Sequence, residues 1–259
     1  MPTRPFNKAL VTGAAGDLGG ELCRCLAAAG IDLVVTDVDA VRLQQNVQEL
    51  NRYPGCVVTA FTADLTDLES LETVLRGVAE DHPDIDLLIA NAGIDKPGPI
   101  ESFDWRTAKL HFDINTLANY VMFSVFVPRF LARGSGHVAA VISLGGLIGA
   151  PYEHAYSGSK AAMRMLMDGL RTETRGRGVT FSSIFPSYLE GRMAANNQFN
   201  VRKAVPMRVA AEKITAAILK RKPILKFPRL AALRVSLADS LPVALRDRLL
   251  IREMKEPTR

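Results

Sequence analysis

Hydrophobic residues along the first two thirds of the chain alternate between short continuous runs and longer segments with helical spacing. Continuous apolar runs bounded by turn residues are typical of strands buried on both faces of a sheet. Spacings of three and four residues are typical of helices that bury one face. The predicted strands are Lys8–Thr12, Ile31–Thr36, Val57–Phe61, Ile85–Ala90, His137–Ser143 and Val179–Phe185. The predicted helices are Asp17–Ala29, Asp39–Asn51, Glu69–Glu80, Trp105–Arg133 and Ala155–Arg175.

This alternation of strands and helices predicts the fold class. A helix that joins two parallel strands has to cross one face of the sheet, so repeated units cover both faces. We therefore expect an α/β protein whose doubly wound parallel sheet has about seven strands, with helices on both faces. A final strand at Lys222–Phe227 is expected at the sheet edge or in a dimer contact.

Composition narrows the class of protein. Hydrophobic residues make up 48% of the chain, which is ample for a core. No apolar run reaches the length of about 18 residues that a membrane-spanning helix needs, and the polar N-terminus has no signal-peptide core. The three cysteines, Cys23, Cys25 and Cys56, suit neither a disulfide framework nor metal-ligand spacing. We expect a reduced, cytoplasmic protein without a metal.

Positive charge is concentrated near the C-terminus. The net charge is +5, but residues 220–259 hold eleven Lys or Arg and four Asp or Glu, a net of +7, so the other 219 residues carry about −2. Such a local excess does not indicate a nucleic-acid-binding surface. Leucines at helical spacing between Leu230 and Leu241 predict a basic amphipathic helix there, and a second short helical run follows Pro242. Such a tail packs on its own protein or a partner subunit, or lies on a membrane.

A glycine-rich turn follows the first strand and opens the first helix. Thr12–Gly19 reads Thr-Gly-Ala-Ala-Gly-Asp-Leu-Gly, and this strand–turn–helix context indicates a phosphate-binding loop. Glycines there let the backbone approach a pyrophosphate, whose negative charge the helix N-terminus favours. The predicted dinucleotide-binding residues of this turn are Gly13, Gly16, Asp17, Leu18 and Gly19.

Residues at the ends of the following strands extend this prediction. Asp37 ends the second strand, where a carboxylate can bind both ribose hydroxyls of NAD and repel a 2′-phosphate. Arg42, one helical turn further on, keeps NADP open. Asp37 could instead cap the next helix, a role that Asp39 could fill equally well. Further candidates at the ends of the third and fourth strands are Asp64, Leu65, Asn91, Ala92 and Gly93.

A tyrosine and a lysine four residues apart indicate acid–base chemistry. Tyr156 and Lys160 lie on one face of a predicted helix, and a nearby cation lowers the pKa of a phenol by favouring the phenolate. A phenol tuned in this way is a usable general acid or base near neutral pH. Ser143, thirteen residues before the tyrosine, could hold the substrate oxygen, and Asn115 lies upstream of all three.

Taken in order, these motifs resemble those of the short-chain dehydrogenase/reductase family, over about Lys8 to Pro186. Thr12–Gly19 resembles the family's TGxxxGxG turn, and Asn91–Gly93 resembles its NAG strand end. The residues that fall on the family's catalytic tetrad are Asn115, Ser143, Tyr156 and Lys160.

The resemblance implies a single Rossmann domain and an NAD(P)-dependent oxidoreductase acting on CH–OH groups. In the implied mechanism a hydride passes between the nicotinamide and a carbonyl or carbinol carbon, while Tyr156 transfers the proton. Lys160 lowers the tyrosine pKa and binds the nicotinamide ribose, Ser143 stabilises the oxygen, and Asn115 holds a water of a proton relay. Tyr156, Lys160 and Pro186 are therefore also expected to contact the cofactor.

Three positions depart from the family pattern. Asp17 stands where the family usually has glycine, and a carboxylate beside a pyrophosphate is unfavourable unless it turns away and caps the helix. We therefore expect weaker cofactor binding than is usual. Ser187 replaces the glycine of the usual Pro-Gly pair, and Gly191 replaces a threonine that often contacts the nicotinamide amide. Ala90, in place of the first asparagine of the strand end, is a minor change.

The segments around the candidate tyrosine are mostly apolar. We expect residues 187–205 to form a flexible segment over the substrate and residues 144–152 to form the opposite wall. This favours an apolar secondary alcohol or ketone, although these residues could instead pack the segment against the core. The predicted substrate-binding residues are Ser143, Leu144, Tyr152, Tyr188 and Met193.

We expect the whole chain to form one domain. Residues 1–222 form its cofactor-binding and catalytic part, and residues 223–259 its final strand and basic tail. The resemblance implies a homodimer or homotetramer through the long helices, and the stripe Met163, Leu166 and Leu170 is consistent with such burial. Two alternatives stay open: an NADPH-dependent carbonyl reductase, against which Asp37 argues, and a catalytically silent dinucleotide-binding regulator, against which the complete tetrad argues.

Overall fold

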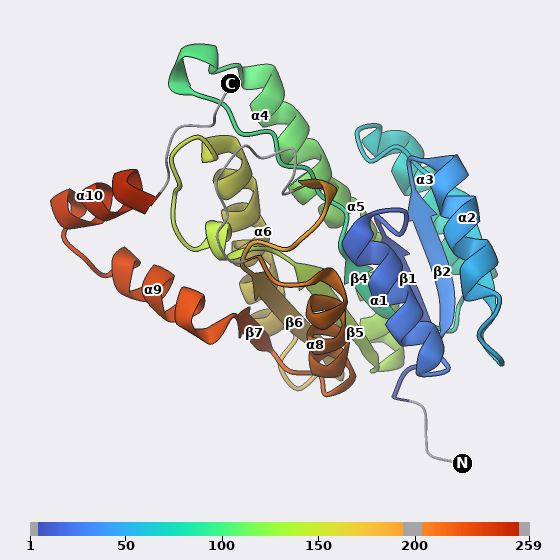
Figure 1. The fold of residues 1–259 in the computed structure, drawn as a ribbon. Helices are drawn as coiled ribbons and strands as arrows, with labels where there is room; N and C mark the ends of the chain where they lie inside the picture. The colour runs from blue at the N-terminus through green and yellow to red at the C-terminus, as the bar shows by residue number, and fades with distance from the viewer. Residues whose placement is uncertain (1–4, 194–203, 254–259) are drawn as a thin grey trace.

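A single seven-stranded parallel sheet organises the computed structural model, which describes residues 5–193 and 204–253 (Figure 1). The strands are β1 (Lys8–Thr12), β2 (Asp32–Asp37), β3 (Val58–Thr62), β4 (Ile85–Ala90), β5 (Gly136–Val141), β6 (Val179–Pro186) and β7 (Ile224–Phe227). Their order is β3-β2-β1-β4-β5-β6-β7. The predicted fold class, an α/β Rossmann sheet of seven strands, is confirmed.

Helices cover both faces of this sheet (Figure 1). They are α1 (Asp17–Ala28), α2 (Ala40–Leu50), α3 (Leu68–Asp81), α4 (Trp105–Phe112), α5 (Ala118–Arg133), α6 (His154–Glu173), α8 (Met207–Leu219), α9 (Arg229–Asp239) and α10 (Val243–Glu253). Both β2 and β4 pair with β1, so the chain builds outward to one edge and then to the other. Such a reversal of strand order leaves a crevice at the carboxyl ends of the central strands.

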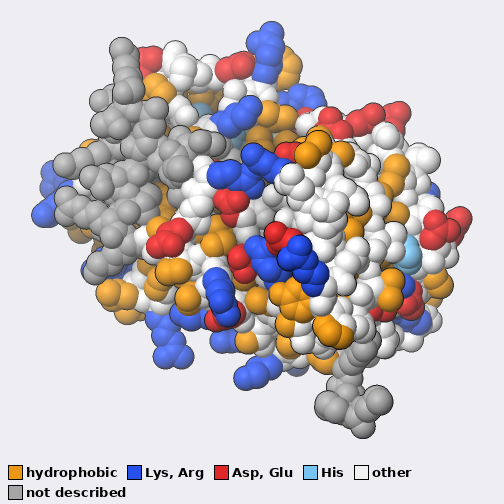
Figure 2. Space-filling model, turned by 45° about the vertical axis from the view of Figure 1, so that its right-hand side comes forward, with side chains coloured by type: hydrophobic (Ala, Val, Ile, Leu, Met, Phe, Trp, Pro, Cys, Tyr) orange, Lys and Arg blue, Asp and Glu red, His pale blue; other side chains and the backbone are white. Residues whose placement is uncertain are grey.

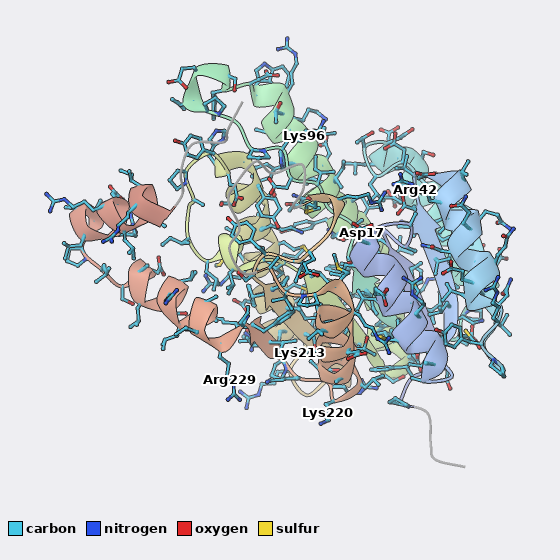
Figure 3. The ribbon with its side chains drawn as sticks, viewed as in Figure 1. Asp17, Arg42, Lys96, Lys213, Lys220 and Arg229 are labelled. Carbon is cyan, nitrogen blue, oxygen red and sulfur yellow. The ribbon has the colours of Figure 1, made fainter. Side chains whose placement is uncertain are left out.

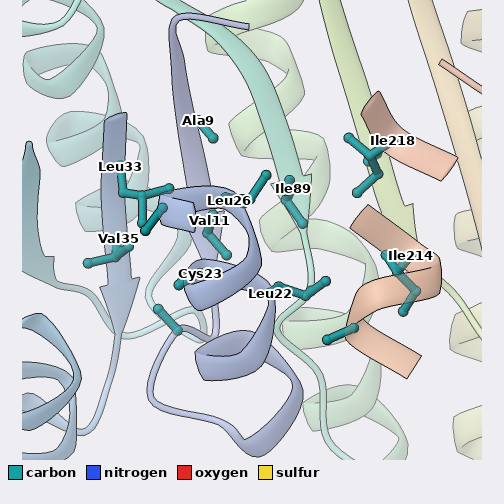
Figure 4. Close-up of a cluster of buried hydrophobic side chains, with 14 of the residues drawn as sticks. Ala9, Val11, Leu22, Cys23, Leu26, Leu33, Val35, Ile89, Ile214 and Ile218 are labelled. Carbon is teal, nitrogen blue, oxygen red and sulfur yellow. The ribbon is translucent and has the colours of Figure 1, made fainter. Parts of the chain in front are cut away.

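Alternating side chains of the central strands form two apolar layers. On β1, Ala9 and Val11 join one buried cluster with α1 and α8, while Leu10 joins the other with α3 and α5. Successive residues of a strand point to opposite faces, so a continuous apolar run fills both layers. Figure 4 shows the first layer, where Leu22 and Leu26 of α1 pack over the strands. The core therefore fixes the strand ends that bear the predicted site.

The long predicted helix Trp105–Arg133 is continuous but not regular. A five-residue π-helical turn, Asp113–Leu117, separates α4 from α5 and contains the buried Asn115. Such π-turns inside helices occur frequently at functional sites, because the extra residue redirects neighbouring groups. The side chain of Asn119 donates to the carbonyl oxygen of Asn115 over 3.0 Å.

One helix was not predicted from the sequence. Residues 207–219 form α8, and its buried Ala210, Ile214 and Ile218 pack beside α1. The stripe that was consistent with a subunit contact packs largely within the chain. Met163 is buried in the second apolar layer, and Leu166 and Leu170 pack against that layer. The same chain therefore buries Met163 fully and the two leucines in part.

The C-terminal helices extend from the β7 edge as an arm (Figure 1). The predicted strand and both predicted helices of this region are present as β7, α9 and α10. The leucines of α9, Leu230, Leu233 and Leu237, are exposed. Among the residues that the structure describes, no helix is both long enough and apolar enough to cross a membrane. On the face in Figure 2, Lys and Arg side chains are spread among acidic and apolar ones.

Candidate active site

A cavity of about 1800 Å³ opens along the carboxyl ends of the strands, where the strand order reverses. The turn after β1, the loop after β6 and helices α9 and α10 all contribute to its lining. Every residue predicted to bind a cofactor lines this cavity: Gly13, Gly16, Asp17, Leu18, Gly19, Asp37, Asp64, Leu65, Asn91, Ala92, Gly93, Tyr156, Lys160 and Pro186.

The glycine-rich turn has the close packing that a dinucleotide site requires. Gly13 has a φ of +69°, in the left-handed region that favours glycine. A Cβ on Gly19 would overlap the carbonyl of Gly13, so only glycine lets α1 start this close to the turn. The backbone and the helix N-terminus thus form a cradle that suits a pyrophosphate. The geometry of this turn therefore fits the pyrophosphate of the dinucleotide that the sequence predicts here.

Asp37 is not a helix cap. Its Oδ2 accepts from the backbone N–H of Ala15 over 2.9 Å, and its Oδ1 accepts from that of Asp39 over 3.1 Å. Asp39 is the N-cap of α2, where it accepts from the N–H of Arg42 over 3.0 Å. The carboxylate of Asp37 is therefore fixed at the edge of the cavity beside the phosphate-binding turn. Arg42 also lines the cavity and contacts Asp39 over 3.4 Å.

The strand end Asn91–Gly93 joins the turn to the catalytic residues. The Asn91 side chain donates to the carbonyls of Thr12 and Gly13 over 3.0 and 3.2 Å. A Cβ on Gly93 would lie 3.0 Å from Asn115 Oδ1 and 3.1 Å from Lys160 Nζ. Because Gly93 has no side chain, the asparagine and the lysine can both reach this point.

The four tetrad candidates converge at this end of the cavity. The Asn115 side chain donates to the Ile94 carbonyl and to Ser159 Oγ, each over 3.0 Å, and is fully buried. Lys160 Nζ donates to the Val141 carbonyl over 3.1 Å and lies 5.8 Å from the centre of the Tyr156 ring. Ser143 and Tyr156 share a side-chain hydrogen bond. Of the four, Ser143, Tyr156 and Lys160 line the cavity, and Asn115 does not.

The electrostatics of the tyrosine differ from the prediction. Burial raises the pKa of Tyr156 above that of a free phenol, and the hydrogen bond to Ser143 lowers that pKa by less. Burial also lowers the pKa of Lys160 to about 8, against the opposing charge of Asp95. The predicted lowering of the tyrosine pKa by the lysine is not found in this structure: burial raises that pKa, and the group that lowers it is Ser143.

Two departures from the family pattern lie in contact. The carboxylate of Asp17 accepts from the backbone N–H of Arg192 over 2.8 Å and from its Nε over 2.7 Å. Gly191 has a φ of +140°, and a Cβ there would lie only 2.7 Å from Asp17 Oδ2. Asp17 therefore neither caps α1, whose N-cap is Gly16, nor stands unpaired. It holds the loop after β6 against the glycine-rich turn.

Arg192 is a cavity residue that the sequence analysis did not identify. Its guanidinium also donates to the Ala15 carbonyl over 3.1 Å, which places a cation at the phosphate-binding turn. Figure 3 shows Asp17 and Arg42 at the same end of the sheet, while Lys213 and Lys220 lie toward the other end. No sequence spacing links Arg192 to Asp17, 175 residues away, so only the fold reveals this pair.

Glu153 and Asp95 are two further cavity residues that were not predicted. Glu153 lies three residues before Tyr156 and is 5% exposed. Burial and, to a lesser extent, the charge of Asp95 raise the pKa of Glu153 to about 8, against the hydrogen bond from Tyr188. Acidic groups therefore interrupt the apolar substrate end of the cavity.

Four of the five predicted substrate-binding residues lie at the cavity. Ser143, Leu144, Tyr188 and Met193 line the cavity. Tyr152 does not, and its carbonyl instead accepts from the N–H of Gly98 over 2.9 Å.

The two ends of the predicted substrate segment are tied together. The N–H of Glu190 donates to Val205 O, and that of Val205 donates to Tyr188 O, each over 2.9 Å. Asn196, Asn197, Gln198 and Phe199 of that segment lie outside the described residues. Within residues 5–193 and 204–253, no cluster of His, Cys, Asp and Glu side chains could hold a metal ion.

Comparison with known proteins places these features in a family context. Residues 7–201 match the family described as short chain dehydrogenase. An uncharacterized oxidoreductase of Myxococcus xanthus is 28% identical over 247 residues, which cover 95% of this chain and 97% of that protein.

Solved structures share the fold. A short-chain dehydrogenase from Sphingobium yanoikuyae in complex with NADPH has a TM-score of 0.81 at 24% identity, over 98% of each chain. An NAD⁺-bound xylitol dehydrogenase has a TM-score of 0.74 at 19% identity, over 82% of this chain and 92% of that one. At these identities the likeness concerns the arrangement of strands and helices.

Proposed function

Because this chain belongs to the short-chain dehydrogenase/reductase family, we propose that it transfers a hydride between NAD(H) and a secondary alcohol or ketone with a largely apolar body. Membership makes it an NAD(P)-dependent oxidoreductase that acts on CH–OH groups. The observation that carries the finer proposal is the convergence of Ser143, Tyr156 and Lys160 on one cavity with the glycine-rich turn.

In the proposed reaction, Tyr156 exchanges a proton with the oxygen of the reacting carbon. A bound nicotinamide dinucleotide supplies the hydride donor or acceptor. Ser143, whose Oγ accepts from the N–H of Gly145 over 3.0 Å, can donate its own proton to the same substrate oxygen. That hydrogen bond stabilises the negative charge that develops there. The hydrogen bond between Ser143 and Tyr156 supports this division of roles.

Lys160 and Asn115 complete the proposed proton path. The ammonium of Lys160 is buried beside the tyrosine ring, so a phenolate formed during the reaction has a cation close by. The pKa of about 8 leaves this lysine mostly protonated at neutral pH. Asn115 holds its position through two donated hydrogen bonds and the π-turn, as a support for the lysine end of the path.

The cofactor choice follows from Asp37. A carboxylate fixed at the end of β2 binds ribose hydroxyls and repels a 2′-phosphate, which favours NAD. The similar structures hold NADPH in one case and NAD⁺ in the other, so the likeness alone leaves both open. Arg42 at the same edge is the residue that would support NADP.

Asp17 and Arg192 both affect how the pyrophosphate is bound. The salt bridge neutralises the carboxylate that would otherwise face the phosphates, and Arg192 can turn one or more of its N–H groups toward them. This arrangement removes the reason to expect weakened cofactor binding from Asp17 alone. The salt bridge would then hold the loop after β6 on the glycine-rich turn both in the free protein and with the cofactor bound.

Turnover with matched cofactors tests the proposed function. The wild-type protein is expected to reduce NAD⁺ in the presence of some members of a panel of secondary alcohols, with a higher kcat/KM for NAD⁺ than for NADP⁺. Asp37→Ala should lower or reverse this preference. A higher kcat/KM for NADP⁺ in the wild type would favour the carbonyl reductase, and cofactor binding without any turnover would favour the regulator.

A further inference from the structure

A buried carboxyl group stands at the substrate end of the cavity without a role in the proposed proton path. Glu153 is the residue before α6, three positions before Tyr156, and it is 5% exposed. It lines the same cavity as the catalytic tyrosine. Buried carboxyl groups are costly unless their oxygens are hydrogen-bonded, so this one needs an explanation.

One oxygen of this carboxyl group lacks a partner. Among the described residues, Oε1 of Glu153 has no hydrogen bond, although it is enclosed by the protein. The phenol of Tyr188, on the loop after β6, hydrogen-bonds the same carboxyl group. The end torsion of a glutamate is broad and nearly two-fold, so either oxygen can face the cavity while the other accepts from the tyrosine. A ligand that donates a hydrogen bond would satisfy the remaining oxygen.

This acceptor lies beside the reacting groups. A methyl group built on Gly145 would lie 3.4 Å from Ser143 Oγ, 3.5 Å from Tyr156 Cε1 and 3.8 Å from Glu153 Oε2. One small group at this point would therefore touch the serine, the tyrosine and the carboxyl group. A substrate whose reacting oxygen is held by Ser143 would place a neighbouring substituent within reach of Glu153.

We propose that Glu153 and Tyr188 recognise a second hydroxyl group next to the reacting carbon, so that the substrates are diols or hydroxyketones with an apolar body. This inference rests on the proposed oxidoreductase function and refines its substrate class. The carboxyl group accepts from the second hydroxyl, and Tyr188 holds the carboxyl group in place. Leu144 and Ile148 line the same cavity and suit the apolar body.

A neutral hydroxyl fits this position better than an ammonium group. The ammonium of Lys160 lies 5.8 Å from the centre of the Tyr156 ring, and the charge of Asp95 acts on both the lysine and Glu153. Burial keeps Glu153 mostly protonated near neutral pH, and a protonated carboxyl group can hydrogen-bond a hydroxyl but does not attract a cation. A positive substrate would also be repelled by Lys160 and by the oxidised nicotinamide ring.

Binding of matched alcohols to the loaded enzyme tests this inference. The full chain with bound NADH, or with NADPH if only that binds, is titrated with cyclohexanol and with trans-cyclohexane-1,2-diol by calorimetry. Neither alcohol can react with a reduced cofactor, so the titrations report equilibrium affinity alone. We expect the dissociation constant of the diol to lie about tenfold or more below that of cyclohexanol.

Variants at Glu153 separate recognition from general packing. Glu153→Met should remove the preference for the diol while leaving cyclohexanol affinity within about twofold. Glu153→Gln retains a carbonyl oxygen as acceptor and should retain most of the preference. Glu173→Met, at the exposed end of the same helix, is the matched control and should change neither dissociation constant.

The possible outcomes separate the two proposals. Equal affinity for both alcohols, no binding of either, or a Met variant that weakens both equally would overturn the role of Glu153. Tighter binding of trans-2-aminocyclohexanol than of the diol would overturn the choice of hydroxyl over ammonium. An intact diol preference with no turnover of any alcohol under NAD⁺ or NADP⁺ would contradict the proposed function and leave the recognition site standing.

Discussion

Asp17 and Gly191 depart from the family pattern at distant points of the sequence, yet their atoms meet. The carboxylate of Asp17 occupies the space that a side chain at position 191 would need, and it accepts two hydrogen bonds from Arg192. Each departure is therefore compatible with the other. Considered one at a time in the sequence, both looked like losses, since neither signals its partner.

Removing Arg192 tests its effect on the cofactor. Arg192→Ala should raise the dissociation constant of NADH by about tenfold, because it removes a cation from the turn and leaves the Asp17 carboxylate facing the pyrophosphate. Asp17→Gly in the same protein should restore most of the affinity. Fluorescence titration of the two single variants and the double variant measures this coupling. Independent, additive effects of the two substitutions would contradict the proposed neutralisation.

Glu153 gives the protein a pH-dependent stability. Its pKa is raised from 4.5 to about 8 on folding, so the protonated form is favoured in the folded state. The stability that this group contributes is full below about pH 4.5 and is lost as the pH rises toward 8. Glu153→Gln cannot ionise and avoids this loss. Its stability relative to the wild type should therefore increase between pH 5 and pH 8, by up to about 1.4 kcal/mol for each step of one in pH.

Denaturant unfolding at several pH values measures this difference. Glu173→Gln is the control, because it makes the same chemical change at an exposed position of the same helix. Its stability relative to the wild type should be nearly constant over the same range. A Gln variant at position 153 with an equally flat profile would show that the buried carboxyl group keeps an ordinary pKa.

At the scale of elements, periodicity located nearly all of the helices and strands. The strands were predictable because continuous apolar runs of this length fill both layers of a parallel sheet. The π-turn around Asn115 was not predicted. Helix α8 was missed, although Ala210, Ile214 and Ile218 recur every four residues.

Helix α8 should contribute strongly to stability because it closes the first apolar layer. Ile214 is fully buried beside α1. Ile214→Ala should lower the free energy of unfolding by about 2–5 kcal/mol, through lost burial and the cavity left behind. Val209→Ala, on the same helix but exposed, should change it by less than about 0.5 kcal/mol. Equal effects of the two variants would mean that the helix packs loosely on the sheet.

At the scale of the whole molecule, the motifs predicted the position of the site better than its chemistry. Glycines and strand-end residues meet at the strand-order reversal because the topology brings them there. The charged pair of Asp17 and Arg192 and the carboxyl group of Glu153 could not be predicted, since their partners come from loops with no periodic pattern. The raised tyrosine pKa also depends on burial, which a motif does not report.

Exposed apolar residues on the long helices suggest how copies of the chain associate. Tyr120 of α5 and Met165 of α6 are exposed, unlike the stripe from Met163 that packs inward. We expect a homodimer or homotetramer through this surface. Light scattering should give a multiple of the 28.2 kDa chain mass for the wild type and a lower mass for Met165→Glu. Leu233→Glu, on the exposed face of α9, is the control and should leave the mass unchanged.

The same control variant addresses the membrane interpretation of the C-terminal arm. If α9 bound anionic vesicles through its exposed leucines, the wild-type protein would sediment with them and Leu233→Glu would not. If α9 does not bind membranes, both proteins should stay in the supernatant. If the wild type sediments with the vesicles and Leu233→Glu does not, the arm is a membrane contact.

Turnover by Tyr156→Phe tests whether this phenol carries the proton. We expect the variant to bind NADH with a dissociation constant within about twofold of the wild type, yet to lose about 10²–10⁴-fold in kcat with any alcohol that the wild type oxidises. Tyr53→Phe, a tyrosine that does not line the cavity, should keep both values. If Tyr156→Phe retained wild-type turnover, the phenol would not be the group that takes the proton from the alcohol, and the proposed mechanism would be wrong.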